Sequence, residues 1–500
     1  MRKRRLIYNT ASSIVNQFIT IISGFILPKL ILTYYGSDVN GLVSSITQFL
    51  GFIALLDLGV GAVVQSAYYK PLADNDIRRT SLLFLNSRRF FRKIGLSLLA
   101  YVLLLCIFYP RFVITPFSDL YTVTLILAIA VSLFFQYFFA IPNQLILNAD
   151  QRFYIQSNAQ IVCIILNVII STILILCGFS IQVVKLAASL IFVLRPIYLL
   201  FYVKKHYTID YEVKDPLFKI EQKWNGLAQH FATVIMNSSG AVIISIFLTI
   251  SDVSIYSIYL LVVNGLKQFV NSLADGFSSL LGNIIASGDR EELKRTFSLF
   301  EWIVHNIVVW VYSVTGVLLV SFVMWYTSGI YDADYKQPSF SALLCLSYGI
   351  FCLRLPYNTI ICSSGHFRQT QTSAIIEVLI CIIASCLSVV RFGLVGISLG
   401  MLLAVVYRII YFIKYIHGNI LKYDYQRTIK LFINDLGIIL LVIAVHTVLD
   451  NYIPISEVLL NLILHAFVLS IVSLIILFVL NYFFFNIEVR LVYKMLSHRS

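Results

Sequence analysis

Runs of apolar residues, each about 20 long, recur throughout this 500-residue chain and limit what it can fold into. A run of that length crosses a bilayer as an α-helix, because a helix satisfies its own backbone polar groups where no water can. The chain is 59% hydrophobic and only 12% charged, which is too little charge to cover the surface of a water-soluble protein of this size. The runs also lack the alternating pattern of barrel strands. The sequence therefore predicts an all-α integral membrane protein.

The hydropathy pattern predicts fourteen membrane-spanning helices, of which the third is the shortest. The first follows the basic residues 2–5, is too long for the core of a signal peptide and lacks an Ala-x-Ala cleavage site, so we expect it to be retained. The predicted spans are residues 7–34, 41–67, 94–110, 120–148, 155–178, 181–203, 226–250, 254–285, 298–327, 338–362, 369–390, 394–416, 429–449 and 457–485.

Lysine and arginine residues gather on one side of this arrangement. With the N-terminus inside, the inner segments hold 28 of the 37 basic residues, the outer loops hold three and the spans hold six. The largest inner group lies in the loop 68–93. The positive-inside rule then places both termini in the cytoplasm, and we expect the protein in a bacterial cytoplasmic (inner) membrane. We assign the basic loops to orientation and to contact with anionic membrane lipids, and we expect no nucleic-acid partner.

The sequence offers no evident place for catalytic chemistry. It contains no P-loop and no G-x-G-x-x-G, G-x-S-x-G or H-E-x-x-H motif. Its eight cysteines lie inside apolar runs, without the spacing of a metal site or a disulfide framework. The outer loops are short, which argues against a membrane enzyme such as a polysaccharide polymerase with a sizeable external loop. We therefore expect a protein that is not an enzyme and that has no cofactor and no bound metal.

The chain resembles itself when it is shifted by 214 residues. At this offset helix ends and short motifs coincide, which indicates a duplicated bundle of six helices. Because both halves begin inside, the repeat is parallel and its axis runs along the membrane normal, as in transporters that bind substrate between two rocking lobes. We predict an N-lobe at 1–214 (spans one to six), a C-lobe at 215–428 (spans seven to twelve) and a hairpin at 429–500. The matching residues are Ser37, Asp38 and Val39 with Ser251, Asp252 and Val253, Pro142 with Pro356, and Phe153 with Phe367.

Short motifs in a fixed order across about 430 residues of the chain carry a family resemblance. The chain resembles the polysaccharide (O-antigen) repeat-unit flippases of the Wzx type in the multidrug/oligosaccharidyl-lipid/polysaccharide (MOP) exporter superfamily, which also contains the lipid II flippase MurJ and the MATE drug exporters. The motifs are NTASS at 9–13, LILTYYG at 30–36, NGL at 40–42, LDLGVG at 56–61, YKPL at 69–72, RRFFRK at 88–93, YSIY at 256–259 and ASGD at 286–289.

The resemblance implies a MATE/MurJ-like fold and a lipid-linked substrate. Undecaprenyl-pyrophosphate-linked oligosaccharide units would be flipped from the inner to the outer leaflet by alternating access, for capsule, O-antigen or exopolysaccharide synthesis. Partners would include a polysaccharide polymerase and chain-length machinery, and transport would be coupled to H+ or Na+. The alternative is a cation-coupled, MATE-like exporter of drugs or small solutes. MATE exporters usually have twelve spans, so the extra hairpin favours the lipid-linked substrate.

Charged residues within the spans are the candidate site, because a pyrophosphate needs a hydrated, cationic path through hydrocarbon. Lys267 lies near the middle of the eighth predicted span, where it either lines a cavity or pairs with another helix. Lys29 follows Pro28 and either lines the cavity or extends to the outer interface. Arg195 precedes Pro196 and either lines the cavity or satisfies carbonyls that the proline frees.

The acidic residues within the spans are candidates for ion coupling. Arg354 and Glu377 should lie at similar depth on either side of a turn near residue 365, which predicts a buried salt bridge. Alternatively, Arg354 contacts substrate and Glu377 is a coupling carboxylate that takes up a proton. Asp57, in the LDLGVG motif, either pairs with a cation of another helix or binds a coupling ion, and Asp275, two turns beyond Lys267, is a further candidate for ion coupling. Two more basic residues lie near the span borders, where we expect them to extend to lipid phosphates: Lys185 and Arg408.

Overall fold

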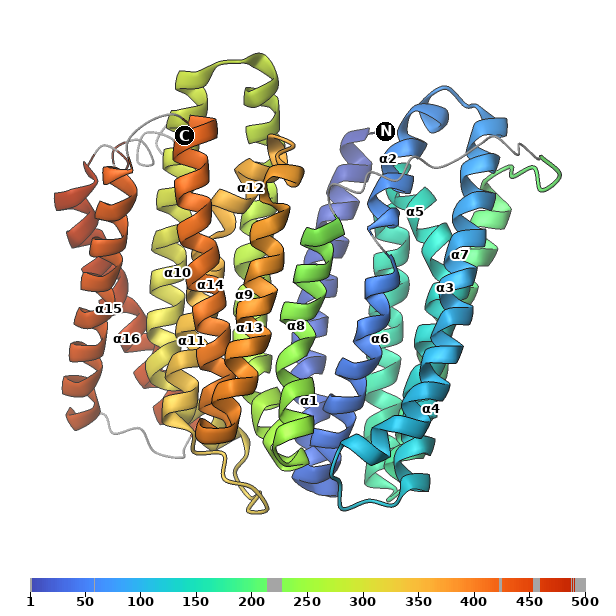
Figure 1. Cartoon of the computed structure of the whole chain (residues 1–500), viewed down its shortest axis with the longest axis horizontal. Helices are drawn as coiled ribbons and strands as arrows, with labels where there is room; N and C mark the ends of the chain where they lie inside the picture. The colour runs from blue at the N-terminus through green and yellow to red at the C-terminus, as the bar shows by residue number, and fades with distance from the viewer. Residues whose placement is uncertain are drawn as a thin grey trace. The chain divides into compact units, whose positions relative to one another are not determined.

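The structure is a computed structural model that describes residues 2–57, 59–213, 227–421, 425–452 and 459–486, together with residues 488 and 490. The described residues form helices and short connections, with no strand among them (Figure 1). Contacts within the chain divide it into two units, Met1–Ser254 (unit 1) and Ile255–Ser500 (unit 2). The predicted boundary at 214/215 lies outside the described residues. The division into six, six and two helices stays a prediction.

The first helical segment turns back on itself at Gly36. Helix α1 (Arg2–Gly51) is interrupted there, where φ is 85° and ψ is 175°, a conformation open to glycine. A straight helix over the 51 residues of this span would be about 76 Å long, more than twice the thickness of the hydrocarbon core. Near its start, Asn9 Nδ2 donates to Gln151 O at 3.0 Å, just past α5 (Ile141–Ala149). Beyond η1 (Phe52–Asp57), α2 (Val60–Ala73) also packs on α5, so both ends of the segment lie together.

The turn at Gly36 reconciles the observed helices with the predicted number of spans. Thirteen helical segments in the described part are long and apolar enough to cross a membrane. The first of them contains two crossing helices, one on each side of Gly36. The total of fourteen agrees with the sequence-based prediction, and the chain is a multi-pass membrane protein.

Unit 1 continues from α2 with long helices and one π-helical turn, η2. These elements are α3 (Ile77–Phe112), α4 (Asp119–Phe135), η2 (Gln136–Ala140), α5, α6 (Phe153–Leu176), α7 (Ile181–His206) and α8 (Leu227–Phe247). The predicted third span, 94–110, is too short, and most of the predicted loop 68–93 is helical. Helix α3 begins with the N-cap Asp76, which accepts from Arg79 N at 2.9 Å, and its first turns bury Phe84 and Phe91. A hydropathy window misses this amphipathic stretch because its arginines lower the average.

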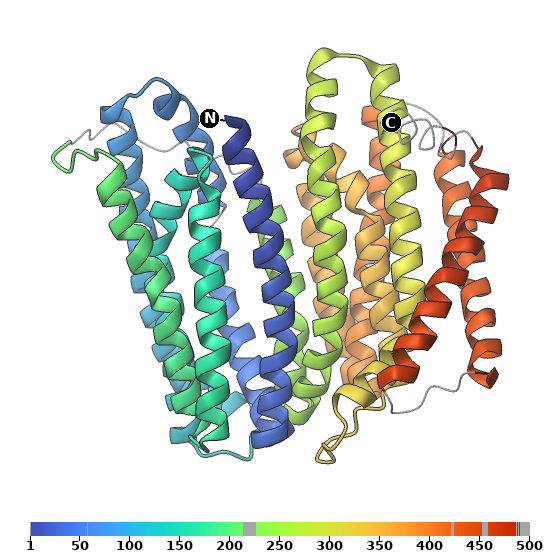
Figure 2. The same ribbon diagram turned by 180° about the vertical axis from the view of Figure 1, so that it is seen from behind.

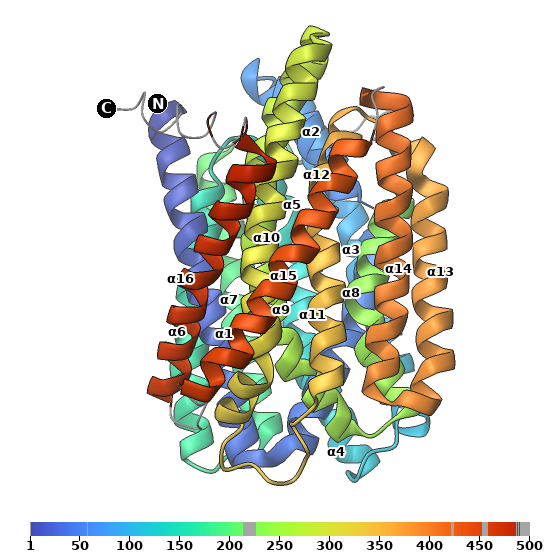
Figure 3. The same ribbon diagram turned by 90° about the vertical axis from the view of Figure 1, so that its left-hand side faces the viewer.

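Unit 2 is built from α9 (Ile250–Ser287), which begins in unit 1, and the elements that follow it. They are α10 (Arg290–Tyr326), α11 (Pro338–Leu353), α12 (Leu355–Ser363), α13 (Phe367–Phe392), α14 (Leu394–Ile416), η4 (His417–Leu421), α15 (Gln426–Tyr452) and α16 (Leu459–Phe484). Figures 2 and 3 show the hairpin α15–α16 lying beside α10, and both of its helices pack on α10. Ile438, Val442 and Leu469 of the hairpin form a buried cluster with Val309 and Leu318 of α10.

The helix bounds repeat at the offset seen in the sequence. Helix α5 (141–149) becomes α12 (355–363) when 214 is added to both ends, and the starts of α6 and α13 differ by the same number. The π-helical turn that ends at Ala140 corresponds to the break between α11 and α12 at Arg354. Asp289 caps α10 as Asp76 caps α3, accepting from Glu292 N at 2.9 Å. The duplication therefore includes the helix breaks and the N-caps as well as the membrane spans.

The two equivalent turns contact each other within unit 1. Asn40 Nδ2 donates to Ser254 Oγ at 2.8 Å, and these two residues are 214 positions apart. Ser251 donates to Asp38 beside them. Gly41 is packed so closely that a Cβ there would lie 1.9 Å from Ile250 O. Residues that correspond in the repeat thus form a tight polar contact.

Helices α13 and α14 form the closest helix pair of unit 2. One residue, Gly393, connects them. A Cβ on Gly400 of α14 would lie 2.2 Å from Ser385 Oγ and 2.5 Å from Ser385 N on α13. Ser388 Oγ donates to Gly396 O at 2.8 Å. Small residues at these positions let the two backbones approach, as at many helix contacts in membranes.

We predict that Gly400→Ala destabilises the protein by about 1–3 kcal/mol, because the added methyl group overpacks a backbone contact. The matched control is Gly437→Ala in α15, where a Cβ would meet nothing within 4 Å. That variant should be neutral or slightly stabilising, since alanine favours helices. Thermal unfolding of the two purified variants in detergent measures the difference. Equal melting temperatures would show that the α13–α14 contact can accommodate the added methyl group.

Candidate functional site

Four charged side chains meet inside unit 2. Glu377 of α13 is 2% exposed and forms an ion pair with Arg354, which lies between α11 and α12. Arg408 of α14 approaches the other carboxylate oxygen, with Nε 3.5 Å from Oε2. The predicted Arg354–Glu377 salt bridge is thus present, and Glu377 holds a second arginine as well. The hairpin geometry explains the arrangement, because α13 and α14 run side by side from Gly393.

Arg408 corrects one expectation from the sequence. It does not extend to lipid phosphates, because it is only 2% exposed. Its Nη1 donates to Thr370 O at 3.3 Å and also to Ser373 Oγ, both on α13. Its guanidinium carbon lies 4.4 Å from the centroid of the Phe412 ring. The position of a residue along a span can be read from sequence, but the face it presents to the next helix cannot.

Lys267 of α9 joins this group through an aromatic ring. Its Nζ lies 4.3 Å from the centroid of Phe351, and the guanidinium carbon of Arg354 lies 4.0 Å from the same centroid. Tyr348 is a second ring near the ammonium, at 5.6 Å. Cation–π contacts of desolvated groups contribute about 2 kcal/mol, so the rings help to hold two cations close together.

The charges of the cluster favour an anionic ligand. Lys267, Arg354 and Arg408 carry three formal positive charges, and Glu377 carries one negative charge, which gives the cluster a formal charge of +2. In a low-dielectric setting such charges act more strongly than in water. Three of the predicted site residues are therefore brought together by the fold. Asp275 also lies on α9, but its side chain lies outside the described residues.

A second polar site surrounds Arg195 in unit 1. Arg195 Nη1 donates to Gln160 Oε1 at 2.7 Å, from α7 to α6. The arginine lines a cavity of about 210 Å³ together with Gln136, Gln144 and Ser132. Gln136 belongs to the π-helical turn η2, a local widening of the helix that is often found at functional sites.

The cavity beside Arg195 is rich in unused hydrogen-bond donors. Arg195 Nε and Gln144 Nε2 are buried and have no hydrogen-bond partner among the described residues. No acidic residue is among the described residues that line the cavity. Arg195 also borders a larger cavity of about 600 Å³ that is lined by Tyr154, Tyr198 and Tyr202. Donors and aromatic rings together suit phosphate oxygens and sugar rings.

Lys29 and Asp57 lie elsewhere in unit 1. Lys29 is half-buried on α1 and is not among the described residues that line either cavity of Arg195. Asp57 ends η1, and its buried Oδ1 has no hydrogen-bond partner in the described part of the chain. His230 of α8 contacts the same turn, with Nε2 2.9 Å from Ala54 O. Lys185 is half-buried and lines a cavity of about 170 Å³ with Asn167.

A buried polar network that the sequence did not predict joins the hairpin to α10. Glu301 and His305 of α10 are both fully buried. Glu301 accepts from Arg427 Nη1 at 2.6 Å and from Thr428 Oγ1 at 2.8 Å, at the start of α15. His305 Nδ1 lies 2.6 Å from Asp435 Oδ2, also on α15. The signal was available in the sequence, since these charged residues interrupt or adjoin predicted spans.

Comparison with known proteins identifies the fold. No protein-family model and no curated protein matches the sequence. Among solved structures, a lipid II flippase MurJ in an inward closed conformation matches with a TM-score of 0.66 and 14% identity, over 97% of this chain and 100% of that chain. An inward-facing multidrug resistance MATE family transporter of the MOP superfamily matches with a TM-score of 0.63 and 14% identity, over 81% of this chain and 98% of that chain. The chain therefore has the MurJ/MATE fold, and these neighbours are transporters.

We predict that Glu377→Gln destabilises the protein by about 3–5 kcal/mol, because Arg354 and Arg408 lose their shared counter-charge. The matched control is Glu291→Gln. Glu291 pairs with Lys294 at 2.9 Å, but its side chain is 85% exposed, so the control should lose less than about 1 kcal/mol. Unfolding by SDS titration of the detergent-solubilised variants measures both effects. A Glu377→Gln variant as stable as the control would contradict a structural role for the carboxylate.

Proposed function

We propose that this protein is a flippase for undecaprenyl-pyrophosphate-linked oligosaccharide repeat units, which it moves from the inner to the outer leaflet of the bacterial cytoplasmic membrane. The process would be alternating access between an N-lobe at 1–214 and a C-lobe at 215–428. The product would serve capsule, O-antigen or exopolysaccharide synthesis. The observation that carries the proposal is the group Lys267, Arg354, Glu377 and Arg408, which has a formal charge of +2 within membrane-spanning helices.

The cationic cluster suits the head of such a substrate. A pyrophosphate is too costly to move through hydrocarbon unless cations and hydrogen-bond donors replace its water. Arg354 and Lys267 offer both, and the Phe351 ring holds the two cations close together. The donor-rich cavity of Arg195 in unit 1 supports a polar substrate in the same way.

The hairpin α15–α16 favours a lipid-borne substrate over a drug. The MurJ structure covers 97% of this chain, whereas the MATE structure covers 81%. The hairpin is held to α10 by the buried Glu301 and His305 contacts and by Trp302 Nε1, which donates to Asn481 Oδ1 of α16 at 2.7 Å. Buried hydrogen bonds and ion pairs thus fix the hairpin to α10. In this position the hairpin can contact the lipid chain of the substrate.

A cation-coupled, MATE-like exporter of drugs or small solutes is the second candidate. The observation in its favour is the buried, unpartnered Oδ1 of Asp57 in the described part of the chain, which could bind a proton or Na+. Glu377 could serve the same coupling if it leaves Arg354 in part of the cycle. The same groups would couple H+ or Na+ to flipping, so coupling alone does not separate the two functions.

We also propose that both termini of the flippase lie in the cytoplasm and that it cooperates with a polysaccharide polymerase and chain-length machinery.

We predict that deleting the gene stops export of the surface polysaccharide and causes the undecaprenyl-pyrophosphate-linked unit to accumulate inside the cell. The lipid-linked pool is measured by extraction and mass spectrometry, and the surface polymer by gel electrophoresis. A plasmid copy of the intact chain is the control and should restore both. A clean deletion with normal polysaccharide and altered drug tolerance would support the exporter instead.

We predict that Lys267→Ala lowers export by about tenfold or more at an unchanged protein level, because a hydrogen bond to a charged group contributes about 1.5–3 kcal/mol. Lys267→Arg keeps the charge and should retain more export than Lys267→Ala. The matched control is Lys336→Ala, which removes an exposed lysine between α10 and α11. Export from Lys267→Ala equal to that from Lys336→Ala would rule out a substrate role for Lys267.

A further inference from the structure

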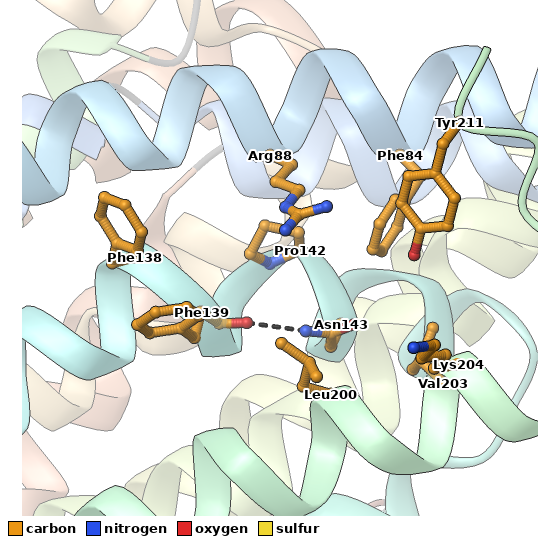
Figure 4. Close-up of a pocket in the computed structure, with 10 residues that line it drawn as sticks. All are labelled: Phe84, Arg88, Phe138, Phe139, Pro142, Asn143, Leu200, Val203, Lys204 and Tyr211. Carbon is orange, nitrogen blue, oxygen red and sulfur yellow. Dashed lines mark hydrogen bonds between the residues drawn. The ribbon is translucent and has the colours of Figure 1, made fainter. Parts of the chain in front are cut away.

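A separate pocket of unit 1 lies between α3, α5 and the end of α7. It has a volume of about 290 Å³, close to the lower end for small-molecule sites. Figure 4 shows Arg88 of α3 above Pro142 and Asn143 of α5, with Lys204 of α7 on another side. None of these residues belongs to the sites of Arg195 or Lys267. The pocket is therefore a feature that the proposed function does not use.

Two cations of this pocket have no counter-charge among the described residues. Arg88 and Lys204 have no ion pair among the described residues, and no acidic residue is among the described residues that line the pocket. The guanidinium carbon of Arg88 lies 5.9 Å from the centroid of the Tyr211 ring, which limits where its charge can point. Asp210 and Glu212 flank Tyr211, but neither forms an ion pair with Arg88 or Lys204 in the described part of the chain.

Two other cations of unit 1, Arg5 and Arg152, are neutralised by one carboxylate. Asp150, just after α5, pairs with Arg5 at 3.0 Å and with Arg152 at 2.8 Å. The same carboxylate accepts from the Tyr207 hydroxyl at 2.7 Å. Burial and this bond to Asp150 raise the pKa of Tyr207, so the hydroxyl stays protonated and keeps donating. Arg88 and Lys204 thus differ from Arg5 and Arg152 in having no such carboxylate among the described residues, and they differ from their unpaired neighbours Arg89 and Lys205 in lining a pocket.

The pocket also has an apolar wall. Phe84, Phe139 and Leu200 line it beside the cations. Asn143 Nδ2 donates to Phe139 O at 2.7 Å, which fixes the amide against this wall. A site with cations on one side and rings and aliphatic groups on the other is suited to an amphipathic molecule with an anionic head.

We propose that this pocket binds a phosphate group, carried either by an anionic lipid headgroup or by a soluble phosphate compound. Arg88 forms the bidentate contact that a guanidinium makes with phosphate, and Lys204 supplies a second charge from α7. Bound phosphate then bridges α3 and α7, which no ion pair connects among the described residues at this pocket. The proposal does not depend on which substrate the protein transports.

Binding to the purified full-length chain in detergent tests this site, with dihexanoyl phosphatidylglycerol as the lipid probe and inorganic pyrophosphate as the soluble probe. Dihexanoyl phosphatidylcholine is the zwitterionic reference. The double variant Arg88→Gln/Lys204→Gln should weaken binding of the anionic probe by about tenfold or more, since two charged contacts are lost. The matched control Arg89→Gln/Lys205→Gln removes the same charge from the two neighbouring exposed positions and should bind as the wild type does.

The outcomes separate the sources of phosphate. Saturable binding of phosphatidylglycerol alone, lost in the pocket variant, identifies a lipid site. Tighter binding of pyrophosphate, lost in the same variant, identifies a soluble phosphate ligand. Equal weakening in both double variants, or no weakening in either, overturns the proposal, because attraction would then come from overall positive charge. Melting temperatures of the variants confirm that both are folded.

Discussion

A charged side chain inside a bilayer needs polar partners, because hydrocarbon provides none. Much of this structure follows from that requirement. Glu377 holds two arginines from different helices of unit 2, and Glu301 holds Arg427 of the hairpin in the same way. In both places one buried carboxylate fixes helices that apolar packing alone would leave free to slide. Lys267 lies beside the Glu377 cluster, against the same Phe351 ring as Arg354.

The sequence predicted the spans well, because hydropathy and charge asymmetry are summed over many residues. The break near Gly36 and the repeat offset were visible for a different reason, because helix ends carry local sequence signals. The start of α3 was predicted wrongly: Arg88 and its basic neighbours lower a hydropathy average even though Phe84 and Phe91 are buried. A single helix can thus be apolar on one face and basic on the other without registering as a span.

The candidate site was predicted only in part. Lys267, Arg354 and Glu377 stood out because charges are rare in spans, and their depths suggested which could meet. Arg408 was assigned to the lipid interface, since nothing in the sequence says that its face meets α13. Gln144 and the His305–Asp435 pair were not predicted, because the sequence shows that polar residues lie within the spans but does not show which side chains face them. Partners are a property of packing, which one sequence does not display.

The single-residue connection at Gly393 has a consequence for how the chain enters the membrane. Because one residue connects α13 and α14, we expect the two helices to enter the bilayer as one hairpin during synthesis. Glu377 and Arg408 face each other across that hairpin. Each would be expensive to insert alone, at about 2.5–3.5 kcal/mol for a charge at the centre of a helix. Within one hairpin, the two residues enter the bilayer with their opposite charges close together. Arg354 precedes them in the chain and can join them when the bundle forms. Biogenesis is thereby eased by the same carboxylate that later organises the folded cluster.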